Sequence, residues 1–346
     1  MQVNTEAPPP GSNAHSRLFQ LDGWRGISIL CVLAAHLLPL GPNEWRLNAT
    51  AGVMGMSLFF SLSGYLITSF LLDRPNPVPF LIRRVCRILP LAWLFMLITL
   101  AVYMRPREEW FANFFFYLNY TTYAQPFNSH LWSLCVEMHF YVSVALLVAI
   151  CGRKGVYLLP IACVVITGMR IATGNYASVN THHRADEILV GATLAIVAHD
   201  FRLSTPTWVN YLNPSVAVIL LCIASSPFSG PVQYLRPYAG GLAIASTLLA
   251  PDHWLSKGLK SKFLVYCATI SYALYVIHGP FRGGWFSGEN SFDRYVIKRP
   301  LGIFLTFLLA HLSTFYFESY WIGVGKRLTS KTRKGQQGQP PFAQPE

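Results

Sequence analysis

Long apolar stretches follow one another along almost the whole chain, separated by short polar segments. About ten of them have a length and composition suited to crossing the hydrocarbon core of a membrane as helices. They cover residues 25–40, 52–72, 87–104, 130–150, 156–173, 185–199, 208–226, 236–250, 263–280 and 299–321. This pattern predicts an all-α polytopic membrane protein with about ten transmembrane helices.

The composition supports a membrane location, and the basic residues suggest an orientation. Of the 346 residues 53% are hydrophobic and only 12% are charged. With both termini in the cytoplasm, seventeen of the 27 Lys and Arg residues fall on the cytoplasmic side, as the positive-inside rule requires. Short loops and contact with anionic membrane lipid account for the net charge of +12, so we expect no nucleic-acid binding.

The chain divides into three regions by composition. Residues 1–17 are expected to form a disordered cytoplasmic arm, and residues 18–322 a membrane domain. Residues 323–346 are polar, basic and Pro-rich towards their end, and are expected to form a disordered cytoplasmic tail. The seven cysteines are scattered singly, which indicates neither a zinc site nor a disulfide framework.

The first apolar segment contains two ionisable residues, Arg25 and His36. Eleven residues are about three helical turns, so the two side chains lie on one helix face, about 16 Å apart along the axis. Ionisable groups inside a membrane helix are costly and usually functional. The pair is therefore a candidate site.

A second polar group lies in the segment 130–150. His130, Ser133, Glu137 and Tyr141 follow one face of a helix whose other faces are apolar. An isolated glutamate there could form a structural hydrogen bond to a neighbouring helix. Beside a histidine of another helix, it could instead orient the imidazole and stabilise its protonated form. We expect Glu137 to orient His36 in this way.

Three arginines lie just before and at the start of the third apolar segment. Arg84 and Arg87 lie one turn apart on a helix face, and Arg83 is adjacent. Positive-inside topology accounts for one or two of them. Because guanidinium groups bind phosphate oxygens in a fork geometry, Arg84 and Arg87 also suit a cytoplasmic phosphate clamp.

Two further segments carry polar residues near the opposite side. Arg184 and Asp186 lie at the start of the sixth apolar segment, where Arg184 and Glu187 are spaced to form a pair. Tyr275 and His278 share a face of the ninth, just before Gly279 and Pro280. The neighbours His182 and His183 point apart and no third ligand matches their spacing, so no metal site is expected.

In order along the chain, these motifs resemble the acyltransferase family 3 of integral membrane acyltransferases. LDGWRGISILCVLAAH is similar to the Arg-x10-His signature, GMSLFFSLSGYLIT to the second-span motif and FLIRRVCRILP to the third-span entry. HLWSLCVEMHFY, RADEILVGATLA and SYALYVIHGP resemble three later motifs. The resemblance covers residues 18–322 and implies that this region is an acyltransferase domain.

The resemblance implies transfer of an acyl group, often acetyl, from a cytoplasmic acyl-CoA to a hydroxyl of a carbohydrate or other small acceptor. It implies that Arg25 and His36 are essential. We expect His36 to be the general base, Ser133 to donate to the oxyanion, and Arg25, Arg84 and Arg87 to bind the CoA phosphates. An equally good interpretation of Ser133 is packing at a helix interface.

We expect the acceptor to contact Arg184, Asp186, Tyr275 and His278. Direct transfer and a transient acyl-histidine both fit these residues, and the sequence leaves the acyl group, the acceptor and the oligomeric state open. Trp24 departs from the family pattern, which usually has a smaller aliphatic residue there. This departure is expected to affect the shape of a substrate channel.

A secondary transporter or flippase of a lipid-linked sugar is the alternative, because intramembrane His, Arg and Glu also mark proton relays. The chain shows no inverted repeat of the kind expected for such a carrier. The expected location is a bacterial cytoplasmic membrane.

Overall fold

The computed structural model describes residues 19–121, 127–200 and 212–337, and in these ranges the chain is helical and contains no strand. The predicted all-α fold is thus confirmed; the predicted arm of residues 1–17 lies outside the described part. The first helices are α1 (Phe19–Leu37), α2 (Leu47–Asp73), α3 (Pro77–Val102), α4 (Arg107–Phe114), α5 (Trp132–Cys151), α6 (Leu159–Ala172), α7 (Thr181–Arg184) and α8 (Asp186–Asp200). They are followed by α9 (Pro214–Ser225), α10 (Arg236–Leu249), α11 (Trp254–Gly258), α12 (Lys262–Thr269), α13 (Ser271–Ile277), α14 (Arg299–Leu312) and α15 (Ser319–Gln337).

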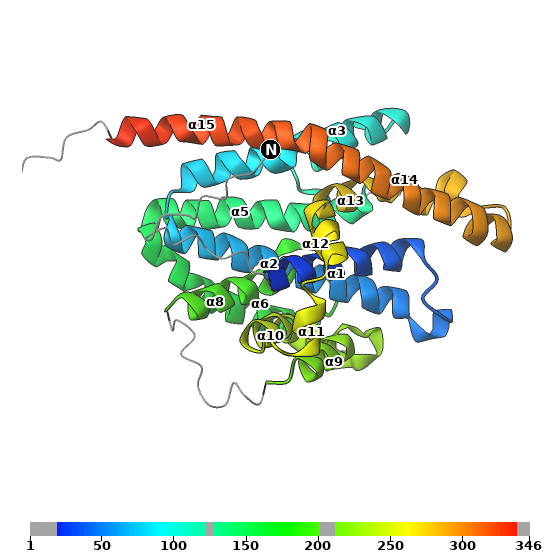
Figure 1. The fold of residues 1–346 in the computed structure, drawn as a ribbon, viewed down its shortest axis with the longest axis horizontal. Helices are drawn as coiled ribbons and strands as arrows, with labels where there is room; N and C mark the ends of the chain where they lie inside the picture. Colours follow the sequence, from blue (N-terminus) through cyan, green and yellow to red (C-terminus); the bar gives the residue numbers. More distant parts are fainter. Residues whose placement is uncertain (1–18, 122–126, 201–211, 338–346) are drawn as a thin grey trace, which may run out of the picture.

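The axes of most long helices are roughly aligned, and these helices form a bundle (Figure 1). Helices α14 and α15 are joined by a π-helical segment, Ser313–Glu318, and extend along one edge beside α3. Helices α9, α10 and α11 lie at the opposite edge. The hairpin between α1 and α2 is at one end of the bundle, so His36 lies towards that end and Arg25 closer to the middle.

Each of the ten predicted apolar stretches overlaps at least one helix. By length and composition, four described helical stretches can cross a membrane: Asn43–Asp73, Pro77–Val102, Ser129–Ala172 and Asp293–Ser330. One shorter apolar helix, Pro214–Ser225, is also found. The structure therefore supports apolar membrane helices; the number ten and the cytoplasmic orientation of both termini stay predictions.

The ninth predicted stretch and the predicted tail differ in detail from the structure. The helix across 263–280 is interrupted at Ile270, which separates α12 from α13. Helix α15 continues to Gln337, so residues 323–337 are helical and not disordered as expected. The part of α15 whose side chains are described packs against α3, where Arg83 donates to Thr329 at 3.0 Å. Residues 338–346 lie outside the described ranges.

Helices α2 and α8 cross with their backbones in close contact. A Cβ added to Gly64 would lie 1.8 Å from the carbonyl oxygen of Ile188, and a Cβ on Gly191 would lie 1.8 Å from that of Ser61. Small residues allow such approach between membrane helices. This crossing fixes α8, and with it the preceding Arg184, against the centre of the bundle.

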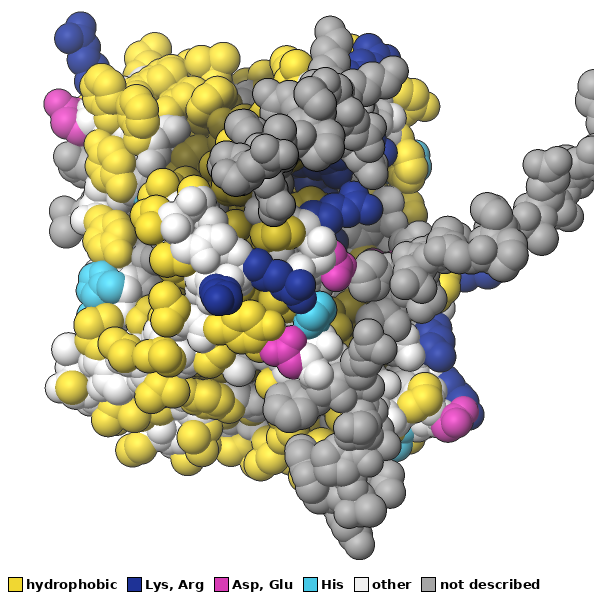
Figure 2. Space-filling model, turned by 90° about the vertical axis from the view of Figure 1, so that its left-hand side faces the viewer, with side chains coloured by type: hydrophobic (Ala, Val, Ile, Leu, Met, Phe, Trp, Pro, Cys, Tyr) yellow, Lys and Arg dark blue, Asp and Glu magenta, His cyan; other side chains and the backbone are white. Residues whose placement is uncertain are grey.

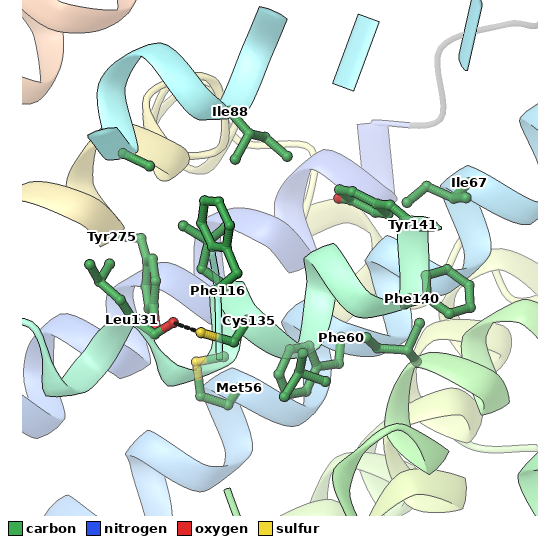
Figure 3. Close-up of a cluster of buried hydrophobic side chains, with 14 of the residues drawn as sticks. Met56, Phe60, Ile67, Ile88, Phe116, Leu131, Cys135, Phe140, Tyr141 and Tyr275 are labelled. Atoms are coloured by element: carbon green, nitrogen blue, oxygen red, sulfur yellow. Dashed lines mark hydrogen bonds between the residues drawn. The ribbon is translucent and has the colours of Figure 1, made fainter. Parts of the chain in front are cut away.

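The core around the polar clusters is apolar and closely packed. Figure 3 shows Met56 of α2 beside Cys135 of α5, with Phe60 also on α2, while Ile88 of α3 lies on the opposite side of the same cluster. The thiol of Cys135 donates to the carbonyl of Leu131 at 3.6 Å. Deep burial of these side chains fixes the helices that hold the polar residues.

The outer surface carries many large apolar side chains. Examples are exposed at Ile98 of α3, Leu146 of α5, Val164 of α6 and Phe304 of α14. A soluble monomer rarely exposes apolar surface on so many helices. Their distribution is that expected of helices in contact with lipid.

One end of the bundle is distinctly basic. Figure 2 looks at the end opposite the α1–α2 hairpin and shows Lys and Arg side chains among apolar ones, with few acidic side chains in view. Arg74, Arg153 and Lys154, which were predicted to be cytoplasmic, are all exposed. The positive-inside rule expects basic residues of this kind on the cytoplasmic side; which end is cytoplasmic stays a prediction.

Candidate active site

The structure groups the polar residues of the core into two clusters at different depths along α1. The histidine cluster contains His36, His130 and His278, and the arginine cluster contains Arg25, Arg84 and Arg87. Since α1 rises 1.5 Å per residue, Arg25 and His36 are about 16 Å apart along its axis. The two clusters can therefore bind different parts of a substrate, or two different substrates.

In the histidine cluster, three segments distant in sequence converge. His36 Nδ1 lies 2.9 Å from His278 Nε2, and the two rings stack with centroids 5.0 Å apart. His130, just before α5, packs its ring edge-on to His278 with centroids 4.6 Å apart. Gly279 allows this packing, because a Cβ there would lie 2.5 Å from His130 Cε1.

The hydrogen bonds determine which nitrogen of His36 is free. His278 Nδ1 lies 2.7 Å from the carbonyl oxygen of Tyr275, and because a carbonyl only accepts, His278 Nδ1 carries the proton. In the neutral ring His278 Nε2 is then an acceptor, so His36 Nδ1 donates to it. His36 Nε2 is left unprotonated, with a lone pair that can accept a proton.

A cavity of about 570 Å³ adjoins His36 and His130. Its wall also includes Tyr275, Arg184 and Arg282, and its volume is within the range of small-molecule sites. This cavity is called the outer cavity below. The structure thus brings four of the predicted residues together. His36, Arg184 and Tyr275 line the outer cavity, and His278 lies behind His36.

Ser133 supports this wall from behind. Tyr275 donates its hydroxyl proton to the carbonyl oxygen of His130. Ser133 Oγ lies 2.6 Å from the Tyr275 hydroxyl, and because Tyr275 has no second proton, Ser133 is the donor of this bond. Ser133 is buried and does not line the outer cavity, so its position fits the interpretation of a helix-interface serine better than that of an oxyanion donor.

The arginine cluster surrounds Glu137. Arg25, Arg84 and Arg87 line a small cavity of about 40 Å³ together with Glu137 and Tyr141. The guanidinium carbon of Arg84 lies 5.6 Å from the centre of the Tyr141 ring. This cavity is called the inner cavity below.

A third cavity of about 200 Å³ shares Arg84 and Arg87 with the inner cavity. Its described wall also contains Arg83, Lys326, Ile322 and two phenylalanines, Phe70 and Phe80. Four basic side chains beside two aromatic rings form a surface suited to phosphates next to a planar base. Arg25, Arg84 and Arg87, which were predicted to bind the CoA phosphates, lie together around the inner cavity; their role stays a prediction.

Glu137 does not have the expected partner. Its carboxylate accepts hydrogen bonds from the Ser63 and Tyr141 hydroxyls, whereas His36 is paired with His278. The expectation that Glu137 orients His36 is therefore wrong. The physical reason is depth: Glu137 follows His130 by seven residues, about two helical turns, and lies beside Arg25.

Asp186 belongs to a buried charge network beside the outer cavity. It accepts from Arg170, and Thr167 Oγ1 lies 3.4 Å from its Oδ2. Glu187 pairs with Arg236 at 2.7 Å and with Arg184 at 3.3 Å. Asp186 is fully buried and is not part of the described cavity wall, so the structure places it behind Arg184 and not in the position expected for an acceptor ligand.

Three residues of the site did not stand out in the sequence. His130 is one member of the polar stripe on the segment 130–150, Ser63 lies within the second-span motif GMSLFFSLSGYLIT, and Arg282 belongs to no motif. The signal for Arg282 is its position four residues after His278, just beyond Pro280. Trp24 lies elsewhere: it donates to Thr247 at 2.8 Å on α10 and lines neither cavity.

Comparison with known proteins identifies the class. The model of the acyltransferase 3 family, described as an acyltransferase domain, matches residues 18–318, and the chain belongs to this family. The match begins at the predicted start of the membrane domain and ends four residues before its predicted end. No solved structure matches the chain.

Among curated proteins, the chain is similar to bacterial O-acetyltransferases. It is 27% identical over 307 residues to a protein of Staphylococcus aureus (strain COL) named "Putative O-acetyltransferase", covering 75% of the chain and 49% of the relative. It is 28% identical over 319 residues to the Bacillus subtilis "Putative peptidoglycan O-acetyltransferase YrhL", with 77% and 49% covered. It is 27% identical over 352 residues to the peptidoglycan O-acetyltransferase OatA of Listeria monocytogenes, with 86% and 55% covered. The chain therefore spans about half the length of these relatives.

Proposed function

We propose that the chain is a membrane O-acetyltransferase that moves an acetyl group from acetyl-CoA to a hydroxyl of a carbohydrate. The observation that carries this proposal is the hydrogen-bond chain from the Tyr275 carbonyl through His278 to His36. It leaves a basic nitrogen on a residue that lines the outer cavity. Family membership and the names of the relatives support acetyl as the group and a cell-wall carbohydrate as the acceptor.

The donor binds from the arginine-rich side. Arg84 and Arg87, shared by two cavities, hold the phosphates of CoA, and Phe70 and Phe80 lie beside the adenine. The pantetheine arm then extends past Arg25 towards His36. We place the arginine side in the cytoplasm, where acyl-CoA is made, and the outer cavity at the far face of a bacterial cytoplasmic membrane.

Two aromatic rings separate the donor side from the acceptor side. Phe59 lines the inner cavity and Tyr275 the outer cavity, and their rings stack with centroids 6.2 Å apart. The thioester reaches His36 by displacing or passing this pair. While this pair is closed, Phe59 and Tyr275 separate the thioester from water and from the acceptor in the outer cavity.

In the proposed reaction, His36 Nε2 removes the proton of the acceptor hydroxyl while its oxygen attacks the thioester carbonyl carbon. The tetrahedral intermediate collapses by breaking the carbon–sulfur bond. The proton then passes from His36 to the CoA thiolate, giving an O-acetyl ester and free CoA thiol. General acid–base catalysis of this kind contributes about 10²- to 10⁴-fold to the rate.

The test uses the purified chain in liposomes with labelled acetyl-CoA and muropeptide fragments of peptidoglycan as the acceptor. The proposal predicts a labelled acceptor that is heavier by one acetyl group. Movement of the unmodified acceptor across the membrane, without any gain in mass, would instead indicate the transporter alternative. Label that is released only as free acetate would contradict transfer to the carbohydrate.

A further inference from the structure

The charged side chains in the described wall of the outer cavity are all basic. Its charged wall residues are Arg184 and Arg282, and none of the described residues that line it is Asp or Glu. Arg184 is 3% exposed. A guanidinium in such a place is stabilised most by an anion that can accept its hydrogen bonds.

The charge network behind Arg184 does not balance. Three guanidiniums, those of Arg170, Arg184 and Arg236, face two carboxylates, those of Asp186 and Glu187. Glu187 lies closer to Arg236 than to Arg184. Burial is the main factor that lowers the pKa of Arg184, to about 10, so Arg184 is cationic at neutral pH with its charge only partly compensated.

Arg282 is the second cation of the wall. It follows α13 in the segment Gly279–Arg282, and its described polar contact is the hydroxyl of Ser129 at 3.4 Å. Burial lowers the pKa of its guanidinium, and no described carboxylate forms an ion pair with it. The two cations come from different helices, so the fold brings them to one cavity.

The same wall contains an unused acceptor. Asn119 donates through Nδ2 to Thr181 Oγ1 at 3.0 Å, which fixes its amide, while its Oδ1 has no described partner. Trp132, also in the wall, adds an aromatic surface.

From this arrangement we infer that the acceptor is an acidic glycan, whose carboxylate or phosphate binds Arg184 and Arg282 while its hydroxyl faces His36. The inference rests on the proposed acetyl transfer and narrows its acceptor class. The anion is the acceptor's own group and not a phosphate of CoA, because the arginine cluster that suits CoA lies about three turns of α1 away.

The first test identifies the charge of the product. Membranes from cells that express the chain are incubated with labelled acetyl-CoA, and label that also forms with His36→Ala membranes is subtracted. The remaining labelled glycan is expected to bind an anion exchanger at neutral pH and to lose this retention after reduction of its carboxyls or removal of its phosphates. A neutral labelled glycan would overturn the inference but leave the proposed function intact, whereas absence of any His36-dependent label would overturn the proposed function.

The second test uses Arg282→Gln, which leaves the buried charge network untouched. Loss of one charged hydrogen-bonding group is expected to raise the KM for the acidic acceptor about 10- to 100-fold, with the KM for acetyl-CoA unchanged. Arg282→Lys should retain part of the affinity. Arg107→Gln, an exposed arginine outside the cavity wall, is the control and should change neither constant. A rise in the KM for acetyl-CoA alone would assign Arg282 to the donor and contradict the inference.

Discussion

Replacing His278 with alanine removes the group that holds His36 in its basic form. His278 is fully buried and accepts from His36 Nδ1 over 2.9 Å. In His278→Ala the Nδ1 proton of His36 loses this partner, and the ring is free to turn or to carry its proton on Nε2. The variant therefore weakens catalysis without removing the catalytic base.

The size of the effect follows from the burial of this hydrogen bond. A buried donor left without a partner costs about 1–3 kcal/mol, and each 1.36 kcal/mol corresponds to a factor of ten in rate. We therefore expect kcat to fall about 10- to 100-fold. The KM for acetyl-CoA should stay the same, because the arginine cluster is unchanged.

The assay measures initial rates of acetyl transfer in liposomes at several concentrations of acetyl-CoA. His278→Gln should recover part of the rate, since its amide oxygen can accept from His36. His311→Gln is the control, because this histidine of α14 contacts Tyr266 and lines neither cavity. A full rate in well-folded His278→Ala would refute the proposed orientation of His36.

Two further changes test the donor site and the packing of the bundle. Arg87→Gln should raise the KM for acetyl-CoA about tenfold, as expected for one lost phosphate contact, whereas exposed Arg74→Gln should not; equal KM values in both variants would contradict the donor site. Gly64→Ala should destabilise the protein by about 1–3 kcal/mol, because the new Cβ would overlap the backbone of Ile188, and thermal unfolding in detergent measures this. Gly168→Ala is the matched control, since a Cβ there meets nothing within 4 Å; similar unfolding temperatures for the two variants would contradict the close α2–α8 crossing.

The sequence predicted the helical fold and the separation of Arg25 from His36 along α1, because both depend on local patterns. Apolar length specifies a membrane helix, and the eleven-residue spacing of Arg25 and His36 is a property of one helix. Likewise, Arg84 and Arg87 lie one turn apart on α3, and their position beside Arg25 agrees with the proposed clamp.

The sequence could not predict which side chains of different helices meet. The sequence favoured Glu137 as the partner of His36 and placed His278 among the acceptor contacts, and only the packing of α1, α5 and α13 shows that His278 is the partner. His130 and Glu137 share one helix face, yet they differ in depth by about 10 Å, and this places them in different clusters. The same limit applies to Asp186, whose pairing with Arg170 depends on the contact between α6 and α8.

The helical start of the predicted tail has a similar explanation. Residues 323–337 are polar enough to resemble a disordered segment, but α15 packs along α3. Tertiary contacts of this kind override local composition.

The central claim is that His36 is the general base in the transfer of acetyl from acetyl-CoA to a hydroxyl. The most direct measurement is single-turnover transfer of labelled acetyl from acetyl-CoA to the muropeptide acceptor by native protein and His36→Ala, matched for amount and thermal stability in detergent. The account predicts labelled ester with the native protein, a rate about 10²- to 10⁴-fold lower in the variant, and unchanged binding of acetyl-CoA. Transfer by His36→Ala at the native rate would contradict the account.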